Sequence, residues 1–142
     1  MGLPQESFSG LLHETARLWR TELDRRLRPL GLSQAKWRML LNISCSENCT
    51  QAELAARLGV EAPTVVGLLD RLSADKLVER RESPHDRRSK TVHLCEGGRA
   101  LMKPITEMAE NLSAELLSVL DAEEVAISTK ALRKIRNQLL SL

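Results

Sequence analysis

The chain has 142 residues, of which 42% are hydrophobic and 28% charged, and its formal net charge is +2. This length allows one domain with a modest core, and no apolar run is long enough to cross a bilayer, so we expect a cytoplasmic protein. The three cysteines and three histidines lack zinc-site spacing. We find no phosphate loop, nucleophile elbow or paired carboxylates, so neither an enzyme nor a cofactor is expected.

Two helices are predicted in the first third of the chain. Apolar residues recur at helical spacing from about Ser7 to Arg28, and Pro29 and Gly31 should end that helix. Ser33 is a favourable N-cap for a second helix, from about Gln34 to Ile43.

A third, short helix is predicted by a capping box. The Thr50 hydroxyl can accept from the backbone N–H of Glu53, whose carboxylate can reach back to the N–H of Thr50. Gly59 can end this helix, because glycine enters the left-handed region without a Cβ penalty. A helix of this length is marginal alone and must pack on a neighbour.

A fourth helix follows after a tight turn, which completes a helix-turn-helix pattern. Pro63 suits its first turn, where a missing N–H has no partner to lose. Only positions near the start of such a recognition helix reach base edges. Here these positions are Glu61, Ala62, Thr64, Val65 and Val66. Thr64 can hydrogen-bond a base or a phosphate, and small apolar groups can touch a thymine methyl. Arg71 lies further along and suits a phosphate.

Two strands, residues 77–82 and 91–94, are predicted next, joined by a strongly basic tip. A narrow minor groove of DNA attracts an inserted arginine, and Arg87 or Arg88 fits that role. Asp86 cannot bind phosphate favourably, so we expect it to hold Arg88 in position by a charge-assisted hydrogen bond.

These patterns predict an α+β, mainly helical fold, a winged helix-turn-helix, whose partner is double-stranded DNA. The residues predicted to contact DNA come from the two helices and the wing. They are Thr50, Gln51, Ala62, Pro63, Thr64, Val65, Gly67, Arg71, Arg87, Arg88 and Lys90.

Two further helices are predicted after the wing, with Pro104 kinking the first or delaying its start, and Asp121 capping the second. Long apolar stripes at both termini exceed what one wing domain can cover. A second copy of the chain is the economical partner; an intramolecular helical pair is the alternative. We expect a single domain, in which residues 1–32 and 100–142 supply dimerisation helices and residues 33–99 form the winged lobe.

Over nearly its whole length the chain resembles the MarR family of winged-helix regulators, and within it the SlyA-like branch. The matching segments include Leu58-Gly59, Leu69-Asp70-Arg71-Leu72, Leu77-Val78-Glu79-Arg80 and Asp86-Arg87-Arg88-Ser89-Lys90. The resemblance implies a homodimeric transcriptional regulator that reads pseudo-palindromic DNA and is often released by small anionic or phenolic ligands. Three positions depart from the family pattern. Lys76 replaces a glycine, Gly67 an arginine and Cys95 a threonine.

The resemblance also implies a small-molecule effector site at Arg17, Arg20, Ser33 and Trp37. An arginine there could pair with a carboxylate, and Trp37 could contact an aromatic ring. A histidine of close relatives is Leu41 in this chain. In the alternative interpretation, Trp37 is a core residue and the arginines are surface residues.

Two other functions are kept open. Gly67 would fit a winged-helix module that binds a protein instead of DNA. Cys45 and Cys49 would fit a thiol-based switch if they formed a reversible disulfide. Cytoplasmic thiols are usually reduced, which favours the alternative interpretation that the cysteines have no role.

Overall fold

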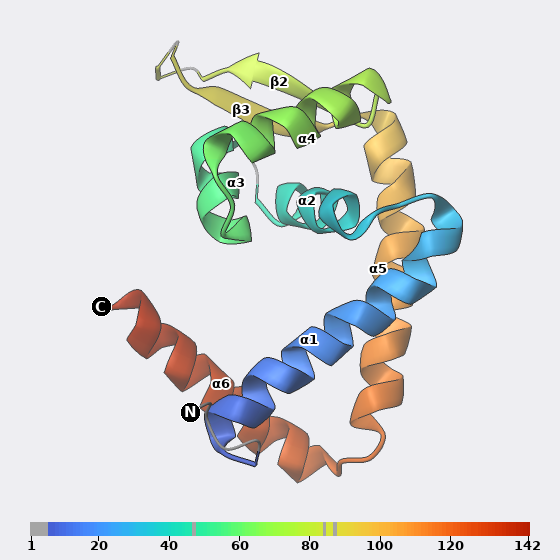
Figure 1. Ribbon diagram of the computed structural model, residues 1–142, viewed down its shortest axis with the longest axis vertical. Helices are drawn as coiled ribbons and strands as arrows, with labels where there is room; N and C mark the ends of the chain where they lie inside the picture. The colour runs from blue at the N-terminus through green and yellow to red at the C-terminus, as the bar shows by residue number, and fades with distance from the viewer. Residues whose placement is uncertain (1–5, 47, 84, 87) are drawn as a thin grey trace. The chain divides into compact units, whose positions relative to one another are not determined.

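The computed structural model describes residues 6–46, 48–83, 85–86 and 88–142. The chain divides into two compact units, one ending at Met108 and the other comprising Ala109–Leu142. Figure 1 shows the helices and the small sheet.

Helices α1 (Phe8–Leu27) and α2 (Gln34–Ser44) confirm the first two predicted helices to within a residue or two. Each begins at a serine, because a serine hydroxyl can accept a backbone N–H that the first turn leaves unpaired. Ser7 Oγ accepts from the N–H of Gly10 at 3.1 Å, and Ser33 Oγ from that of Lys36 at 3.3 Å. Between the helices lies a 3₁₀ turn, η1 (Arg28–Leu30).

Helices α3 (Gln51–Leu58) and α4 (Ala62–Ala74) form the predicted helix-turn-helix. Gly59 has a φ of 66°, so the turn between them uses the left-handed conformation that glycine permits. Thr50 Oγ1 accepts from the N–H of Glu53 at 3.1 Å, as predicted. The reciprocal bond from Glu53 is absent from the described part of the chain, so this cap is only half of the predicted box.

The wing is an antiparallel hairpin of β2 (Val78–Glu82) and β3 (Lys90–Leu94), as predicted. Its register pairs Val78 with Leu94 and Glu82 with Lys90. A two-residue strand, β1 (Cys49–Thr50), pairs with β3 on its other edge, so the sheet order is β1-β3-β2. The sequence did not predict β1, because two residues are too few to show alternation.

One apolar core joins the helix-turn-helix to the sheet. Its members come from α2, α3, α4 and β3, and none exposes more than 1% of its surface: Leu40, Leu54, Val65, Leu69, Leu72 and Val92. Burying side chains of this size stabilises the fold by about 1.5–3 kcal/mol each. The core therefore fixes α4 relative to the hairpin, which lies beside it in Figure 1.

Helix α5 (Glu96–Leu117) starts directly after the sheet, and Pro104 lies inside it. The predicted late start is therefore wrong, and the kink stays a prediction. Two glycines allow this start, because a Cβ at Gly98 would collide with the carbonyl oxygen of Leu77. A Cβ at Gly97 would lie 3.1 Å from the carbonyl oxygen of Lys76.

Helix α6 (Ala122–Leu140) begins with a complete capping box, which confirms the predicted cap. Asp121 Oδ1 accepts from the N–H of Glu124 at 2.8 Å, and Glu124 Oε1 accepts from the N–H of Asp121 at 3.1 Å. None of the helices among the described residues is both long and apolar enough to span a membrane.

Candidate nucleic-acid interface

A pocket of about 300 Å³ opens where the first turns of α3 and α4 meet the wing. We call it the helix–wing groove. It brings together five of the predicted site residues from three elements, together with Ala52, Val66 and Ser89. The five are Gln51, Ala62, Asp86, Arg88 and Lys90. Two of its lining side chains are cationic and one is anionic, so the groove has a net positive charge.

The first turns of α4 present a surface of small side chains. Ala62, Pro63 and Thr64 are exposed, and Val66 is 38% exposed. Val65 is completely buried, so its side chain cannot contact DNA and the prediction for this residue is wrong. The error has a simple cause, because the helical period that places Thr64 outside turns its neighbour into the core.

Two further α4 residues continue the exposed side of the helix. Arg71 is exposed, one turn beyond the half-buried Gly67. A Cβ at Gly67 would meet nothing within 4 Å, so packing does not require a glycine here. Its effect is to leave the helix backbone approachable at the centre of the exposed face.

The wing tip is organised by Asp86, but not in the predicted way. Its Oδ1 accepts from the backbone N–H of Arg88 at 2.9 Å, so Asp86 holds the Arg88 backbone rather than the guanidinium. Its carbonyl oxygen accepts from the N–H of Ser89 at 3.1 Å. Arg88 is exposed, and Lys90 Nζ lies 4.0 Å from Glu82. Arg87, the other candidate for the tip, lies outside the described residues.

The recognition helix and the wing are joined by an ion pair that the sequence did not suggest. Arg80 Nη2 on β2 donates to Asp70 Oδ1 on α4 at 2.6 Å. Arg80 pairs with Val92 across the sheet, so its side chain lies on the face of the sheet that packs against α4. The two residues are ten apart and belong to different elements, and no local spacing rule relates them.

Gln51 and Thr50 differ in what they can offer at the groove. Thr50 Oγ1 already accepts a backbone N–H as the cap of α3, but its own proton remains available. Gln51 Oε1 is buried and has no hydrogen-bond partner among the described residues. An unpaired buried acceptor costs about 1–3 kcal/mol, so an arriving donor would relieve a real penalty.

The turn after α4 contains a strained residue. Lys76 has a φ of 61°, the left-handed region in which a residue with a Cβ is disfavoured by about 1 kcal/mol or more. This is the position where the family pattern has a glycine, which adopts this conformation without that cost. Beside it, Asp75 forms an ion pair with Lys36 at 3.6 Å.

The four predicted effector residues have different surroundings. Trp37 is only 4% exposed and donates its indole N–H to Asp24 Oδ1 at 3.3 Å, which is the behaviour of a core residue. Arg17 and Arg20 are exposed on α1. Ser33, the cap of α2, lines a pocket of about 410 Å³ together with Asp24 and Arg28.

The cysteines are separate thiols with different surroundings. Cys45 is exposed, whereas Cys49 is buried. Burial raises the pKa of the Cys49 thiol, which keeps it in its unreactive protonated form. Within the described ranges, no three His, Cys, Asp or Glu side chains are grouped so that they could hold a metal ion.

Comparison with known proteins places this architecture in a family. A family model described as MarR family matches residues 30–89. The crystal structure of transcriptional regulator PA3341 is 39% identical, with a TM-score of 0.87, and the match covers 96% of this chain and all of that one. Wild-type MarR from E. coli is 30% identical with a TM-score of 0.78, covering 95% of this chain and 98% of its own.

Two similar structures contain DNA. One is a mutant of E. coli MarR complexed with operator DNA, which is 30% identical over 95% of this chain and 99% of its own, with a TM-score of 0.78. The other is a complex of S. aureus MepR with DNA, which is 23% identical over 96% of this chain and 99% of its own, with a TM-score of 0.79. At that identity, MepR supports the fold alone. The present chain belongs to the MarR family of transcriptional regulators.

Proposed function

We propose that this regulator binds double-stranded DNA sequence-specifically, with the start of α4 in the major groove and the wing tip at the minor groove. The helix–wing groove is the observation that carries the proposal, because it places exposed, small α4 side chains beside Arg88 and Lys90. The operator-DNA complex of the 30% identical E. coli MarR supports it.

The exposed side chains suggest separate tasks. Thr64 would hydrogen-bond a base edge or phosphate, and Ala62 or Val66 would touch a thymine methyl. Arg71 would bind a phosphate, which sets position but not sequence. Gln51 lines the groove, but its Oε1 is buried, so this side chain would have to turn outward before it could accept from a base amino group. Arg88, held at its backbone by Asp86, would enter the minor groove.

We further propose that the chain acts as a homodimer on pseudo-palindromic sites. Large apolar side chains are exposed on both terminal helices, including Phe8 at 62% on α1 and Ile127 at 60% on α6. Exposed apolar surface of this kind marks an interaction site, and a second copy is the economical occupant. A two-fold axis would then set two α4 helices about 34–36 Å apart, in successive major grooves. In this arrangement residues 1–32 and 100–142 form the dimerisation helices, and residues 33–99 form the winged lobe.

Release by a small anionic or aromatic ligand, and membership of the SlyA-like branch, rest on the resemblance alone. Buried Trp37, with its N–H paired, is poorly placed to contact a ligand ring. Adding benzoate to the protein–DNA complex tests release directly. Dissociation that is lost in Arg20→Gln but kept in Arg25→Gln would support the predicted effector residues.

A salt titration tests DNA binding and separates it from a protein-binding role. We expect the affinity for duplex DNA, measured by fluorescence anisotropy, to fall steeply as salt rises, because phosphate contacts release counterions. If no binding to duplex DNA is detected even at low salt, the proposal is contradicted, and a winged helix that binds a protein partner is favoured.

A further inference from the structure

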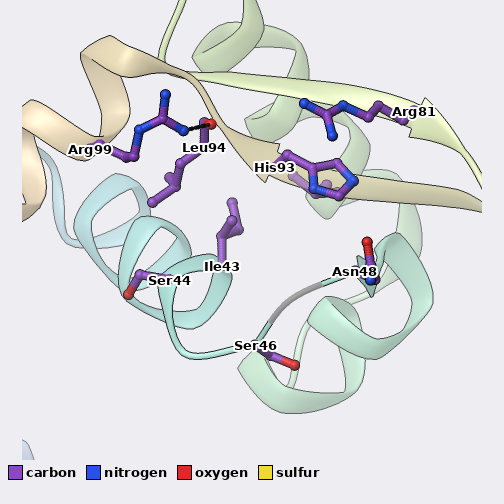
Figure 2. Close-up of a pocket in the computed structure, with 9 residues that line it drawn as sticks. Ile43, Ser44, Ser46, Asn48, Arg81, His93, Leu94 and Arg99 are labelled. Atoms are coloured by element: carbon purple, nitrogen blue, oxygen red, sulfur yellow. Dashed lines mark hydrogen bonds between the residues drawn. The ribbon is translucent and has the colours of Figure 1, made fainter.

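A second pocket, of about 420 Å³, lies beside the wing strands and shares no lining residue with the helix–wing groove. We call it the strand pocket. It is lined by the end of α2, the residues before α3, strands β2 and β3, and the first turn of α5, and Figure 2 shows these side chains: Ile43, Ser44, Ser46, Asn48, Arg81, Val92, His93, Leu94 and Arg99. None of them belongs to the predicted DNA or effector residues.

Two guanidinium groups belong to the strand pocket, on different walls. Arg99, on α5, donates from Nη1 to the carbonyl oxygen of Leu94 at 2.8 Å, which fixes the group without neutralising its charge. Arg81, on β2, donates from Nε to Glu79 Oε1 at 2.7 Å. Glu79 Oε1 also accepts from Arg81 Nη2, so this ion pair offsets the charge of Arg81 and occupies its Nε–Nη2 edge, while Nη1 stays available. An arginine fork matches the oxygens of a phosphate or carboxylate.

His93 supplies a third polar group between these arginines. Its Nε2 lies 2.8 Å from Thr91 Oγ1, so that nitrogen is already paired. The ring nitrogen Nδ1 has no partner in the described parts of the chain. It can accept from a ligand hydroxyl when the ring is neutral, and donate to a ligand oxygen when the ring is charged.

The remaining lining residues indicate which chemical groups the rest of the ligand would carry. On the α2 side, the Ser44 hydroxyl donates to the Leu41 carbonyl oxygen at 2.7 Å and the Ser46 hydroxyl accepts from Arg57 Nη2 at 3.3 Å. Asn48 adds an amide, and Ile43 and Leu94 add apolar side chains. Its nine lining residues include two arginines and no acid. A pocket of this volume can hold a small molecule. Its polar lining residues favour a polar ligand over an aromatic one.

We propose that the strand pocket binds a small, hydroxylated phosphate ester. Arg99 and Arg81 would bind the phosphoryl oxygens, and His93 with the serine and asparagine side chains would bind the hydroxyl groups. The ligand would bridge α2 to the wing strands and to α5 without touching the helix–wing groove.

Calorimetric titration of the DNA-free protein with glycerol 3-phosphate tests this site. Wild type should bind measurably at millimolar concentrations, and Arg99→Gln should bind about tenfold more weakly or worse, because a charge-assisted pair to phosphate is lost. Arg81→Gln serves as a second variant, since Arg99 also contacts a backbone carbonyl. Arg133→Gln, which removes an exposed arginine of α6, should bind like wild type.

Three outcomes would overturn the proposal. One is no heat change with glycerol 3-phosphate at millimolar concentrations. Another is equal binding of inorganic phosphate by wild type and both pocket variants, which means an adventitious ion only. The third is tighter binding of benzoate than of glycerol 3-phosphate, which means that the apolar side chains select the ligand. Because no DNA is present, failure here and failure of DNA binding are separate results.

Discussion

The winged lobe and the last helix differ in how far their apolar side chains are buried. In the lobe, Leu54, Leu69 and Leu72 are completely buried among α2, α3, α4 and the sheet. In α6, which is described throughout, no residue is buried, and Ile127 and Leu139 expose about two thirds of their surface. In one copy of the chain, the apolar side chains of the lobe are therefore buried, whereas those of α6 remain exposed to water.

The contrast indicates which region needs a partner. Each fully buried leucine or isoleucine gains about 1.5–3 kcal/mol from leaving water, and α6 gains little of this alone. The lobe that would read DNA can hold its shape without help, whereas the terminal helices supply the surface for the proposed dimer.

Removing α6 should produce the largest effect. A chain that ends at Val119 loses the exposed apolar side chains of α6, so we expect a complete loss of dimerisation in sedimentation experiments. Circular dichroism should still report the helices of the winged lobe. A truncated chain that sediments as a dimer would show that α6 is dispensable.

Arg88→Ala should weaken DNA binding about ten- to a hundredfold, because a minor-groove arginine is lost from each wing. The slope of affinity against salt should also become shallower. The sedimentation coefficient should not change, since the wing lies outside the terminal helices. Lys103→Ala removes the same charge from an exposed position on α5, and an equal loss of affinity there would argue against a specific role for Arg88.

Lys76→Gly should stabilise the lobe by about 1 kcal/mol, because glycine adopts a φ of 61° without the steric cost that a Cβ brings. Urea unfolding of the two proteins measures the difference. Lys103→Gly, at a helical position, should instead lose about that much. If Lys76→Gly unfolds at a lower urea concentration than wild type, the strain assigned to this turn is absent.

Breaking the Asp70–Arg80 pair should have the smallest effect on stability. Both side chains are partly exposed, so we expect at most about 1 kcal/mol from Asp70→Asn or Arg80→Gln. DNA affinity should nevertheless fall, since the pair ties the recognition helix to the wing. A double-mutant cycle measures the coupling, and strictly additive losses would mean that the two side chains act independently.

The sequence predicted the helices and hairpin well because their signals are local. Ser7, Ser33 and Asp121 mark helix starts through their own side chains, and Gly59 marks a turn by its freedom at positive φ. These devices involve residues within a few positions of one another, so one sequence suffices to read them.

What the sequence did not predict depends on contacts between distant segments. Strand β1 exists because β3 pairs with it, and the Asp70–Arg80 bond exists because the core brings α4 against β2. Gly98 is required by the close approach of the Leu77 carbonyl, a contact between distant residues that no local pattern indicates. At the wing tip, the sequence identified Asp86 and Arg88 as partners but assigned the bond to the wrong atoms of Arg88.

Selection of bound sequences from a pool of random duplex DNA tests the central claim most directly. We expect enrichment of two inverted half-sites whose centres lie about one helical turn apart, because a two-fold dimer places its α4 helices at that spacing. No enriched sequence, or a single half-site without a symmetric partner, would contradict the proposal that two copies read DNA together.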